Sequence, residues 1–270
     1  MKNKKKYVLV IILVFALVII FNVFYLCFKE RKVVVLAYHK IVPTEIKEKY
    51  YKNNKWIDTT ERFEEQMKFL FDHEYTTLSM NEYEKWRNGN KKIPLKTVMI
   101  TIDDGDIETY YEIMPILKKY NFKATYFMIG EKVKIKSEKY HPEKQQFMGL
   151  DLIEKAKKEY PSIELQSHSY GMHRNNDKGP LVYSMSKNEI SEDFDNMKFL
   201  DTNIYCYPYG ALNDNILEVL EEKEYRMAFM LDKSGVSSRN NHKYKIPRVK
   251  INNNTSFSNF KKWLIKGIFM

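Results

Sequence analysis

Cysteine and glycine are scarce in this sequence. Two of its 270 residues are cysteines and nine are glycines, which excludes a disulfide-stapled scaffold and a collagen-like chain. Hydrophobic residues make up 44% of the chain and charged residues 30%. This composition excludes a disordered chain and a membrane protein that crosses the bilayer many times. The length leaves room for one large domain or two small ones.

Acidic residues are outnumbered, and the net charge is +10. Residues 1–32 hold seven basic residues and one acidic residue, whereas residues 33–270 hold 38 basic and 34 acidic residues. Most of the basicity therefore belongs to the amino terminus. The small excess in the remainder, which contains no recognition motif, argues against a nucleic-acid partner.

Residues 7–28 form an apolar stretch in which Asn22 is the only strongly polar side chain. A helix of this length is about 33 Å long, enough to cross a hydrocarbon core of ~30 Å. Lysines precede the stretch, so we expect residues 1–32 to be a single-pass membrane anchor with a cytoplasmic end. Residues 33–270 would then face outward as one domain. A cleaved signal peptide is the alternative, but the stretch is long and residues 25–28 contain no small-residue cleavage site.

Short apolar runs recur through residues 33–270 and predict strands. They are mostly continuous rather than alternating, as in parallel strands that are covered on both faces. The predicted strands are residues 33–38, 75–78, 97–102, 124–129, 163–165, 203–207, 226–231 and 246–251.

Helical patterns lie between several of these strands. Asp58 and Glu61 resemble a capping signal before one helix. Four further helices are predicted over residues 107–120, 150–159, 187–201 and 214–224. Pro115 is expected to kink the first of these four. The alternation of strands and helices predicts an α/β barrel or a doubly wound sheet.

Polar residues follow the predicted strands, where parallel α/β folds collect their chemistry. These residues are His39, Asp103, Asp104, His168, His173 and Tyr209. The two adjacent carboxylates point in different directions, so one can bind a metal while the other handles protons. The Asp103–Asp104 pair alone, or the His168 and His173 pair alone, is also typical of an ordinary polar loop. The two pairs together are far more specific for a functional site. Two imidazoles and one carboxylate are a common zinc ligand set with an open position.

Residues 101–105, Thr-Ile-Asp-Asp-Gly, resemble the T-F-D-D-G first motif of the polysaccharide deacetylases of carbohydrate esterase family 4, the NodB-homology domain. Residues 35–39, 115–117 and 123–127 are similar to the segments that flank this motif in the family. The resemblance runs from about residue 33 to residue 251. It implies a distorted (β/α)7 barrel.

The second and third motifs depart from the family pattern. Residues 168–173 are one residue longer than the usual H-[ST]-x-x-H, as in the subgroup that acts on poly-β-1,6-N-acetylglucosamine, and residues 246–251 resemble the same subgroup. Residues 207–210 match the end of the R-x-P-Y motif, but Cys206 stands where the Arg would be. The D-x-x-D-W and L-x-H motifs are not found.

The resemblance implies a metal-dependent N-deacetylase that acts on N-acetylglucosamine residues of an extracellular polysaccharide. Asp104, His168 and His173 would hold a divalent metal, most plausibly zinc. Asp103 would be the general base, and the backbone N–H of Tyr209 would bind the oxyanion.

Three further residues each have two possible roles. Arg248 is expected to orient Asp103 in place of the missing Arg, with an ordinary surface cation as the alternative. His242 is expected to protonate the leaving amine, with a solvated loop histidine as the alternative. His39 either lines the groove or forms a hydrogen bond within the end of the barrel.

Two other functions stay open at this point. One is a peptidoglycan N-acetylglucosamine or N-acetylmuramic acid deacetylase with the same chemistry, and the other is a glycan-binding protein with a degenerate deacetylase fold. The complete metal set argues against the second, and the oligomeric state is not predicted.

Overall fold

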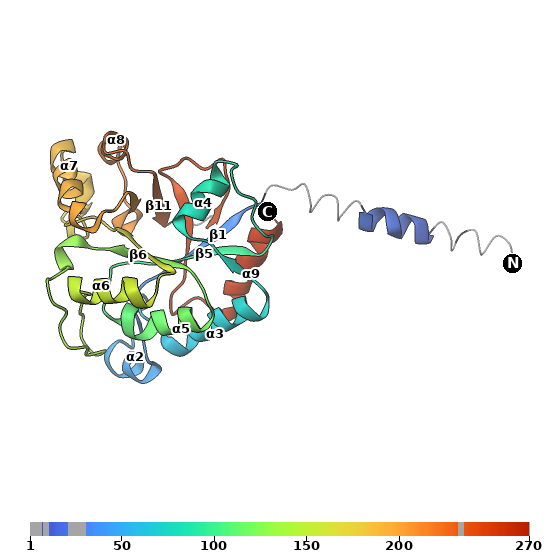
Figure 1. Cartoon of the computed structure of the whole chain (residues 1–270), viewed down its shortest axis with the longest axis horizontal. Helices are drawn as coiled ribbons and strands as arrows, with labels where there is room; N and C mark the ends of the chain where they lie inside the picture. Colours follow the sequence, from blue (N-terminus) through green and yellow to red (C-terminus); the bar gives the residue numbers. More distant parts are fainter. Residues whose placement is uncertain (1–6, 8–10, 21–30, 232–234, 270) are drawn as a thin grey trace. The chain divides into compact units, whose positions relative to one another are not determined.

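The computed structural model describes residues 7, 11–20, 31–231 and 235–269, which form two compact units, Met1–Arg31 and Lys32–Met270 (Figure 1). In the first unit, residues 11–20 are helical. No helix among the described residues is long and apolar enough to span a membrane. The predicted anchor, residues 7–28, lies in part outside the described residues.

The second unit is a closed barrel of seven parallel strands. Pairing of β1 with β5 closes a ring in the order β1, β13, β11, β10, β7, β6, β5. The strands are β1 (Val33–Tyr38), β5 (Thr97–Ile102), β6 (Ala124–Met128), β7 (Ile163–Ser167), β10 (Ile204–Cys206), β11 (Met227–Leu231) and β13 (Ile246–Lys250). The predicted barrel is therefore confirmed.

The barrel is distorted because two strands change partners along their length. The amino half of β1 pairs with β12 (Val236–Ser237) and its carboxyl half with β13. In the same way, β5 pairs first with β4 (Thr76–Thr77) and then with β6. Two small sheets lie outside the ring, β2 (Ile41–Val42) with β3 (Asp58–Thr59) and β8 (Asn175–Asn176) with β9 (Gly179–Pro180).

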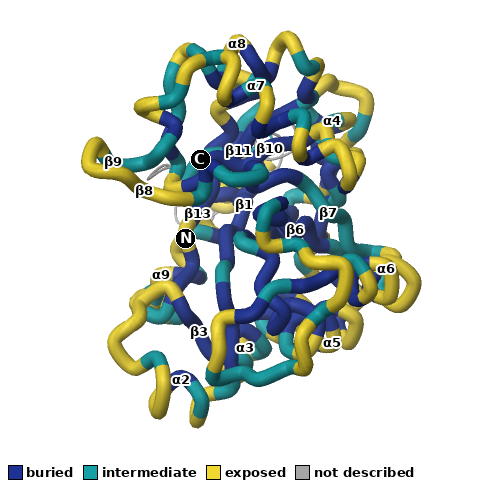
Figure 2. The backbone as a smooth tube through the Cα atoms, turned by 90° about the vertical axis from the view of Figure 1, so that its left-hand side faces the viewer, coloured by how far each residue is buried: buried dark blue, intermediate teal, exposed yellow. Residues whose placement is uncertain are grey.

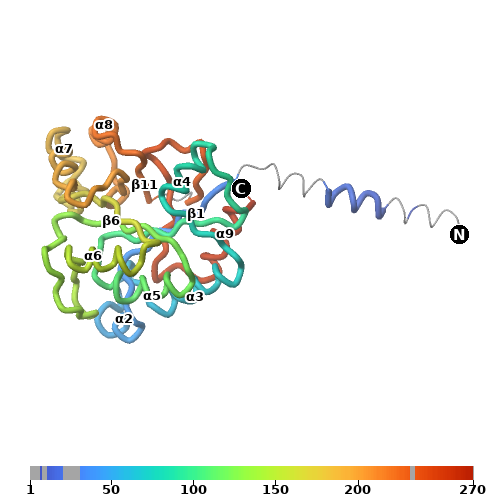
Figure 3. Tube along the Cα trace, in the orientation of Figure 1, coloured from blue at the N-terminus to red at the C-terminus, as the bar shows by residue number. Residues whose placement is uncertain are grey.

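Helices connect most of the strands. They are α2 (Thr44–Tyr50), α3 (Thr60–Asp72), α4 (Met80–Arg87), α5 (Met114–Lys119), α6 (Leu150–Glu159), α7 (Lys187–Asn196), α8 (Asp214–Glu222) and α9 (Phe257–Phe269). In Figure 2 the helices show exposed segments in yellow, whereas the strands of the barrel are mostly buried and coloured dark blue. The chain ends with α9 against the first strand, coloured red and blue in Figure 3, and a Cβ at Gly267 would lie 2.5 Å from Val34 Cγ2.

Both faces of the strands are buried, which explains the continuous apolar runs. In β1, Val33 and Val35 pack with Phe127 in one buried cluster, whereas Val34 and Leu36 belong to another that includes residues of α3, α5, α6 and α9. The odd and even positions of one strand thus contact different cores. A strand of this kind has no polar face to show in its sequence.

Helix boundaries were less predictable than strands. The cap of α3 is Thr59, whose hydroxyl accepts the Arg62 N–H at 3.3 Å, and not Asp58 as predicted. The Asp58 carboxylate instead accepts the Arg62 Nε–H at 2.7 Å. The helix predicted over residues 107–120 is divided into a π-helical turn, Thr109–Ile113, and α5, with Pro115 in the first turn of α5. The sequence reading missed α2, α4 and α9.

Candidate active site and metal site

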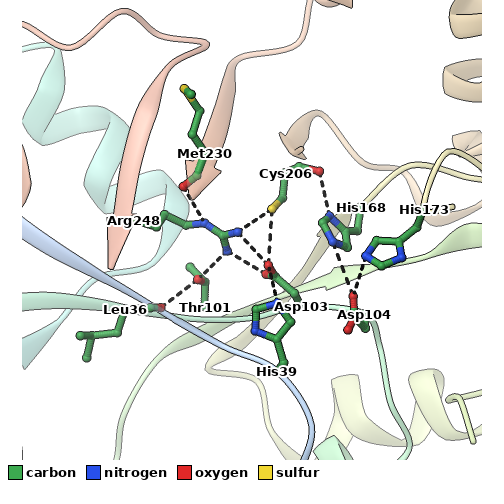
Figure 4. A network of polar contacts seen from close by, with 10 residues as sticks. All are labelled: Leu36, His39, Thr101, Asp103, Asp104, His168, His173, Cys206, Met230 and Arg248. Atoms are coloured by element: carbon green, nitrogen blue, oxygen red, sulfur yellow. Dashed lines mark hydrogen bonds and ion pairs between the residues drawn. The ribbon is translucent and has the colours of Figure 1, made fainter. Parts of the chain in front are cut away.

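The predicted polar residues converge at the carboxyl ends of the strands. Asp103 and Asp104 follow β5, His168 follows β7, and His173 lies in the loop beyond it (Figure 4). They line one pocket of about 240 Å³ together with other residues, including His39, Trp56 and Tyr209. Strands far apart in the sequence thus deliver their terminal side chains to one opening.

Asp104, His168 and His173 form a constellation that fits a metal ion. Asp104 Oδ1 lies 3.3 Å from His173 Nε2 and 3.6 Å from His168 Nε2. This oxygen is buried and has no hydrogen-bond partner in the described part of the chain, which is costly unless a cation faces it. His168 Nδ1 lies 2.8 Å from the carbonyl oxygen of Cys206. Because a carbonyl can only accept, Nδ1 carries the proton and the Nε2 lone pair is available for a metal.

The electrostatics of the three ligands suit a cation. Burial lowers the pKa of His168 to about 3 and lowers that of His173, so both rings are neutral at pH 7. Burial, followed by the charge of Asp103, raises the pKa of Asp104 to about 7. A divalent ion would offset the repulsion between the two carboxylates.

Positive φ angles mark the ends of three strands that surround the pocket. Asp104, Ser169 and Tyr209 have φ values of 77°, 69° and 57°. Such conformations are unfavourable for residues with a side chain and cluster at functional sites. At Gly105, φ is +79° and a Cβ would lie 2.7 Å from Met128 Cε, so the Asp-Asp-Gly turn requires glycine there.

The structure places Arg248 directly on Asp103. Its Nη1 and Nη2 donate to the two carboxylate oxygens, each at 2.7 Å, and the two side chains are 0% and 1% exposed (Figure 4). The guanidinium also donates to Thr101 Oγ1 at 2.9 Å and to the carbonyl of Met230 at 3.3 Å. Burial raises the pKa of Asp103, but the charge and hydrogen bonds of Arg248 outweigh it and hold the pKa well below its usual range.

Cys206 occupies the position of the missing Arg without blocking its substitute. Its sulfur accepts from Arg248 Nη2 at 2.8 Å. The guanidinium thus reaches Asp103 from β13 rather than from β10, and the small thiol of β10 leaves room for it.

A second group, Asp103, His168 and Cys206, also has ligand atoms within reach of one ion. Burial raises the pKa of the Cys206 thiol well above its usual value, and a protonated thiol is a poor ligand. Both oxygens of Asp103 are already engaged by Arg248. The first group is therefore the better metal site.

Comparison with known proteins agrees with this geometry. Residues 90–228 match the polysaccharide deacetylase family. The chain is 31% identical over 238 residues to YxkH of Bacillus subtilis, which is named for the same family, and the match covers 87% of this chain and 77% of that one. The chain belongs to the polysaccharide deacetylase family. It is therefore an enzyme, a hydrolase that acts on amide bonds.

Other proteins with named activities or solved structures are also similar to this chain. A poly-β-1,6-N-acetyl-D-glucosamine N-deacetylase of Staphylococcus aureus is 28% identical over 257 residues, covering 87% of this chain and 84% of that one. The deacetylase PplD of Streptococcus pyogenes, solved with acetate, has a TM-score of 0.74 at 24% identity and covers 87% and 99% of the two chains. IcaB of Ammonifex degensii has a TM-score of 0.69 at 20% identity, with coverages of 87% and 98%. These two structures share the fold of the deacetylase.

His39 lies inside the active-site pocket of the deacetylase. Its Nε2 is 3.8 Å from Asp103 Oδ2, its ring is 5.0 Å from that of Trp56, and its buried Nδ1 has no hydrogen-bond partner among the described residues. Burial lowers its pKa to about 4. Of the two roles left open for His39, the structure thus supports a place in the groove.

His242 does not reach the site, which corrects the prediction that it protonates the amine. It is exposed, it precedes β13, and its Nδ1 accepts the Tyr244 N–H at 3.1 Å. Residues that precede a parallel strand lie at the amino end of the barrel, opposite the pocket. Chain order alone could not exclude this histidine.

Asp193 of α7 is a residue that the sequence reading missed. It is buried, and its carboxylate accepts the N–H of Tyr170 at 2.8 Å and that of Gly171 at 2.6 Å. These two residues lie between His168 and His173, so Asp193 fixes the loop that carries His173. The signal that the sequence offered for Asp193 is its position three residues after Ile190, on the apolar face of a predicted helix.

We predict that Asp193→Ala weakens metal binding about 10- to 100-fold, as expected for a partner that orients a ligand from outside the first coordination sphere. The loop loses two acceptors, so His173 is held less firmly. Zinc competition against a chromogenic chelator measures the change. Glu192→Ala, at an exposed neighbouring position, is the control, and equal affinities in the two variants would contradict the assignment.

Proposed function

We propose that the protein is a metal-dependent N-deacetylase that removes acetyl groups from N-acetylglucosamine residues of an extracellular polysaccharide, with a β-1,6-linked polymer as the preferred backbone. The observation that carries the proposal is the convergence of Asp104, His168 and His173 beside an Asp103 that is paired with arginine. The named activity of the 28% identical Staphylococcus relative supports the choice of polymer.

A divalent metal on Asp104, His168 and His173 would polarise the acetyl carbonyl and make water more acidic. Asp103 then accepts the proton of the attacking water, since Arg248 keeps its carboxylate ionised. The backbone N–H of Tyr209 is assigned to the developing oxyanion, as in the family. The products are acetate and a free glucosamine amine.

The leaving nitrogen needs a proton, and His39 is placed to return it. In the proposed step the proton passes from Asp103 to His39 Nε2, which lies 3.8 Å from Asp103 Oδ2, and from that same nitrogen to the leaving amine, so His39 returns to its neutral form. A relay of this kind moves the proton of water to the amine without a separate acid. It takes the role that the sequence assigned to His242.

We predict that Asp103→Asn and His39→Asn each lower acetate release from N-acetylglucosamine oligomers by a factor of about 10² to 10⁴, the usual loss for a proton-transfer group. The assay uses the chain from residue 32 onward with zinc supplied. Tyr209→Phe is the control because it keeps the backbone N–H, and it should stay within a few-fold of wild type.

Two results would contradict this proton path. The first is full acetate release by Asp103→Asn. The second is wild-type activity that survives removal of the metal by a chelator, because the metal set would then be idle.

The ion pair with Arg248 predicts a pH effect. Arg248 lowers the pKa of Asp103, so protonation of Asp103 itself should not limit activity at mildly acidic pH. Arg248→Gln raises the pKa of Asp103, so the acid limb of kcat/KM should move to higher pH, with Arg248→Lys between the two. Arg226→Gln, which removes a pair with Glu84 far from the site, is the control. An unmoved acid limb in Arg248→Gln would exclude the assigned role.

We also propose that residues 1–32 anchor the enzyme in the cell membrane with its catalytic domain outside, with secretion after cleavage as the alternative. The apolar length and the preceding lysines support the anchor. Cell fractionation should find the intact 32.5 kDa chain in membranes and sensitive to protease added to intact cells. A shortened chain in the medium would support secretion instead.

A further inference from the structure

A second pocket, of about 480 Å³, is lined by residues of α9, of the end of β13 and of the loop between them. Four lysines line it, and no acidic residue among those that the structure describes does so. They are Lys55, Lys250, Lys262 and Lys266. The net charge of residues 33–270 is small, so this concentration of positive charge is local.

These four lysines have no acidic partner among the described residues. Within the described part of the chain, none of the four forms an ion pair, whereas Lys187 on another face contacts both Glu218 and Glu222. Lys250 and Lys266 lie over indole rings instead, 4.5 Å from the Trp56 centroid and 4.3 Å from the Trp263 centroid. Like charges held together without a counter-charge repel one another, and an anion relieves that repulsion.

The neutral lining of the pocket suits a sugar. Asn252 is buried, and its Oδ1 accepts the Asn254 N–H at 3.1 Å, which fixes the loop before α9. Asn259 supplies a further amide, and Trp263 supplies an indole ring that lies under Lys266.

Trp56 links this pocket to the active site. It lines the catalytic pocket, its ring lies 5.0 Å from that of His39, and Lys250 Nζ of the second pocket lies 4.5 Å from its ring centroid. Lys55, which also lines the second pocket, precedes Trp56 in the chain. The two pockets are therefore neighbours.

We propose that the lysine pocket binds a phosphate ester or carboxylate on the polysaccharide, next to the sugar that is deacetylated. The N-acetylglucosamine polymer then carries an acidic substituent close to the sugar that is deacetylated. This inference rests on the proposed deacetylase function. An anionic lipid headgroup has the same charge, but the amide-rich lining and the shared wall with the active site favour a glycan.

The test compares two substrates: a neutral N-acetylglucosamine pentamer, and pentamers that carry one phosphate ester on either side of the central sugar. Wild type should favour at least one phosphorylated pentamer in kcat/KM. The double variant Lys262→Gln/Lys266→Gln should lose about 5- to 10-fold on that substrate alone, the effect of two exposed charge contacts. Raised salt should reduce the wild-type preference in the same way.

Lys92→Gln/Lys245→Gln is the matched control, because both lysines are exposed, precede strands and lie outside the pocket. Calorimetric binding of each pentamer to the zinc-loaded chain separates the site from the reaction. If no pentamer releases acetate but the phosphorylated one still binds through Lys262 and Lys266, the proposed function fails and the site stands.

Three outcomes overturn the proposal. One is equal use of neutral and phosphorylated pentamers by wild type. Another is an equal loss on both substrates in the Lys262/Lys266 variant. The third is a variant that binds both pentamers normally but no longer binds vesicles containing phosphatidylglycerol, which would assign the lysines to a membrane.

Discussion

The buried pair between Asp103 and Arg248 is the interaction on which the site depends. Both side chains are almost fully inaccessible, and each carboxylate oxygen receives one guanidinium N–H. Removing one partner of such a pair costs about 3–5 kcal/mol because the other charge is left buried and uncompensated. Here the cost would be compounded by Asp104, a second carboxylate at the same strand end. The pair also ties β5 to β13 across the barrel end, so stability and catalysis rest on the same contact.

Around this pair, the barrel strands bring the site residues together and the loops hold them in place. Parallel strands bring the two aspartates and two histidines to one edge, and positive φ at Asp104 turns the chain directly after Asp103. Asp193 then braces the His173 loop from α7 through backbone N–H groups. The lysine pocket lies next to this arrangement, through the contact of Lys250 with Trp56. The result is a rigid reaction centre with a charged surface beside it.

The strands and the convergence of Asp103, Asp104, His168 and His173 could be predicted because they rest on local patterns. The pattern alone left a barrel and a doubly wound sheet open, and the family resemblance decided for the barrel. Continuous apolar runs identify strands buried on both faces, and strand ends locate the chemistry. The contacts made across the fold were harder. The sequence alone could not decide whether Arg248 pairs with Asp103 or is a surface cation, because the two residues are far apart in the chain. Asp193 acts on residues more than 20 positions away. His242 has suitable chemistry but precedes its strand, so it lies at the opposite end of the barrel. The helix α9 was missed altogether, and with it the lysines that it brings next to Lys55.

Metal stoichiometry in three versions of the chain from residue 32 onward tests the central claim most directly. The account predicts one zinc ion per wild-type chain, the same in Asp103→Asn, and a large loss of affinity in His173→Ala, because His173 is a ligand and Asp103 is not. Zinc that is retained in His173→Ala but lost in Asp103→Asn would place the ion on Asp103, His168 and Cys206, and would contradict the account.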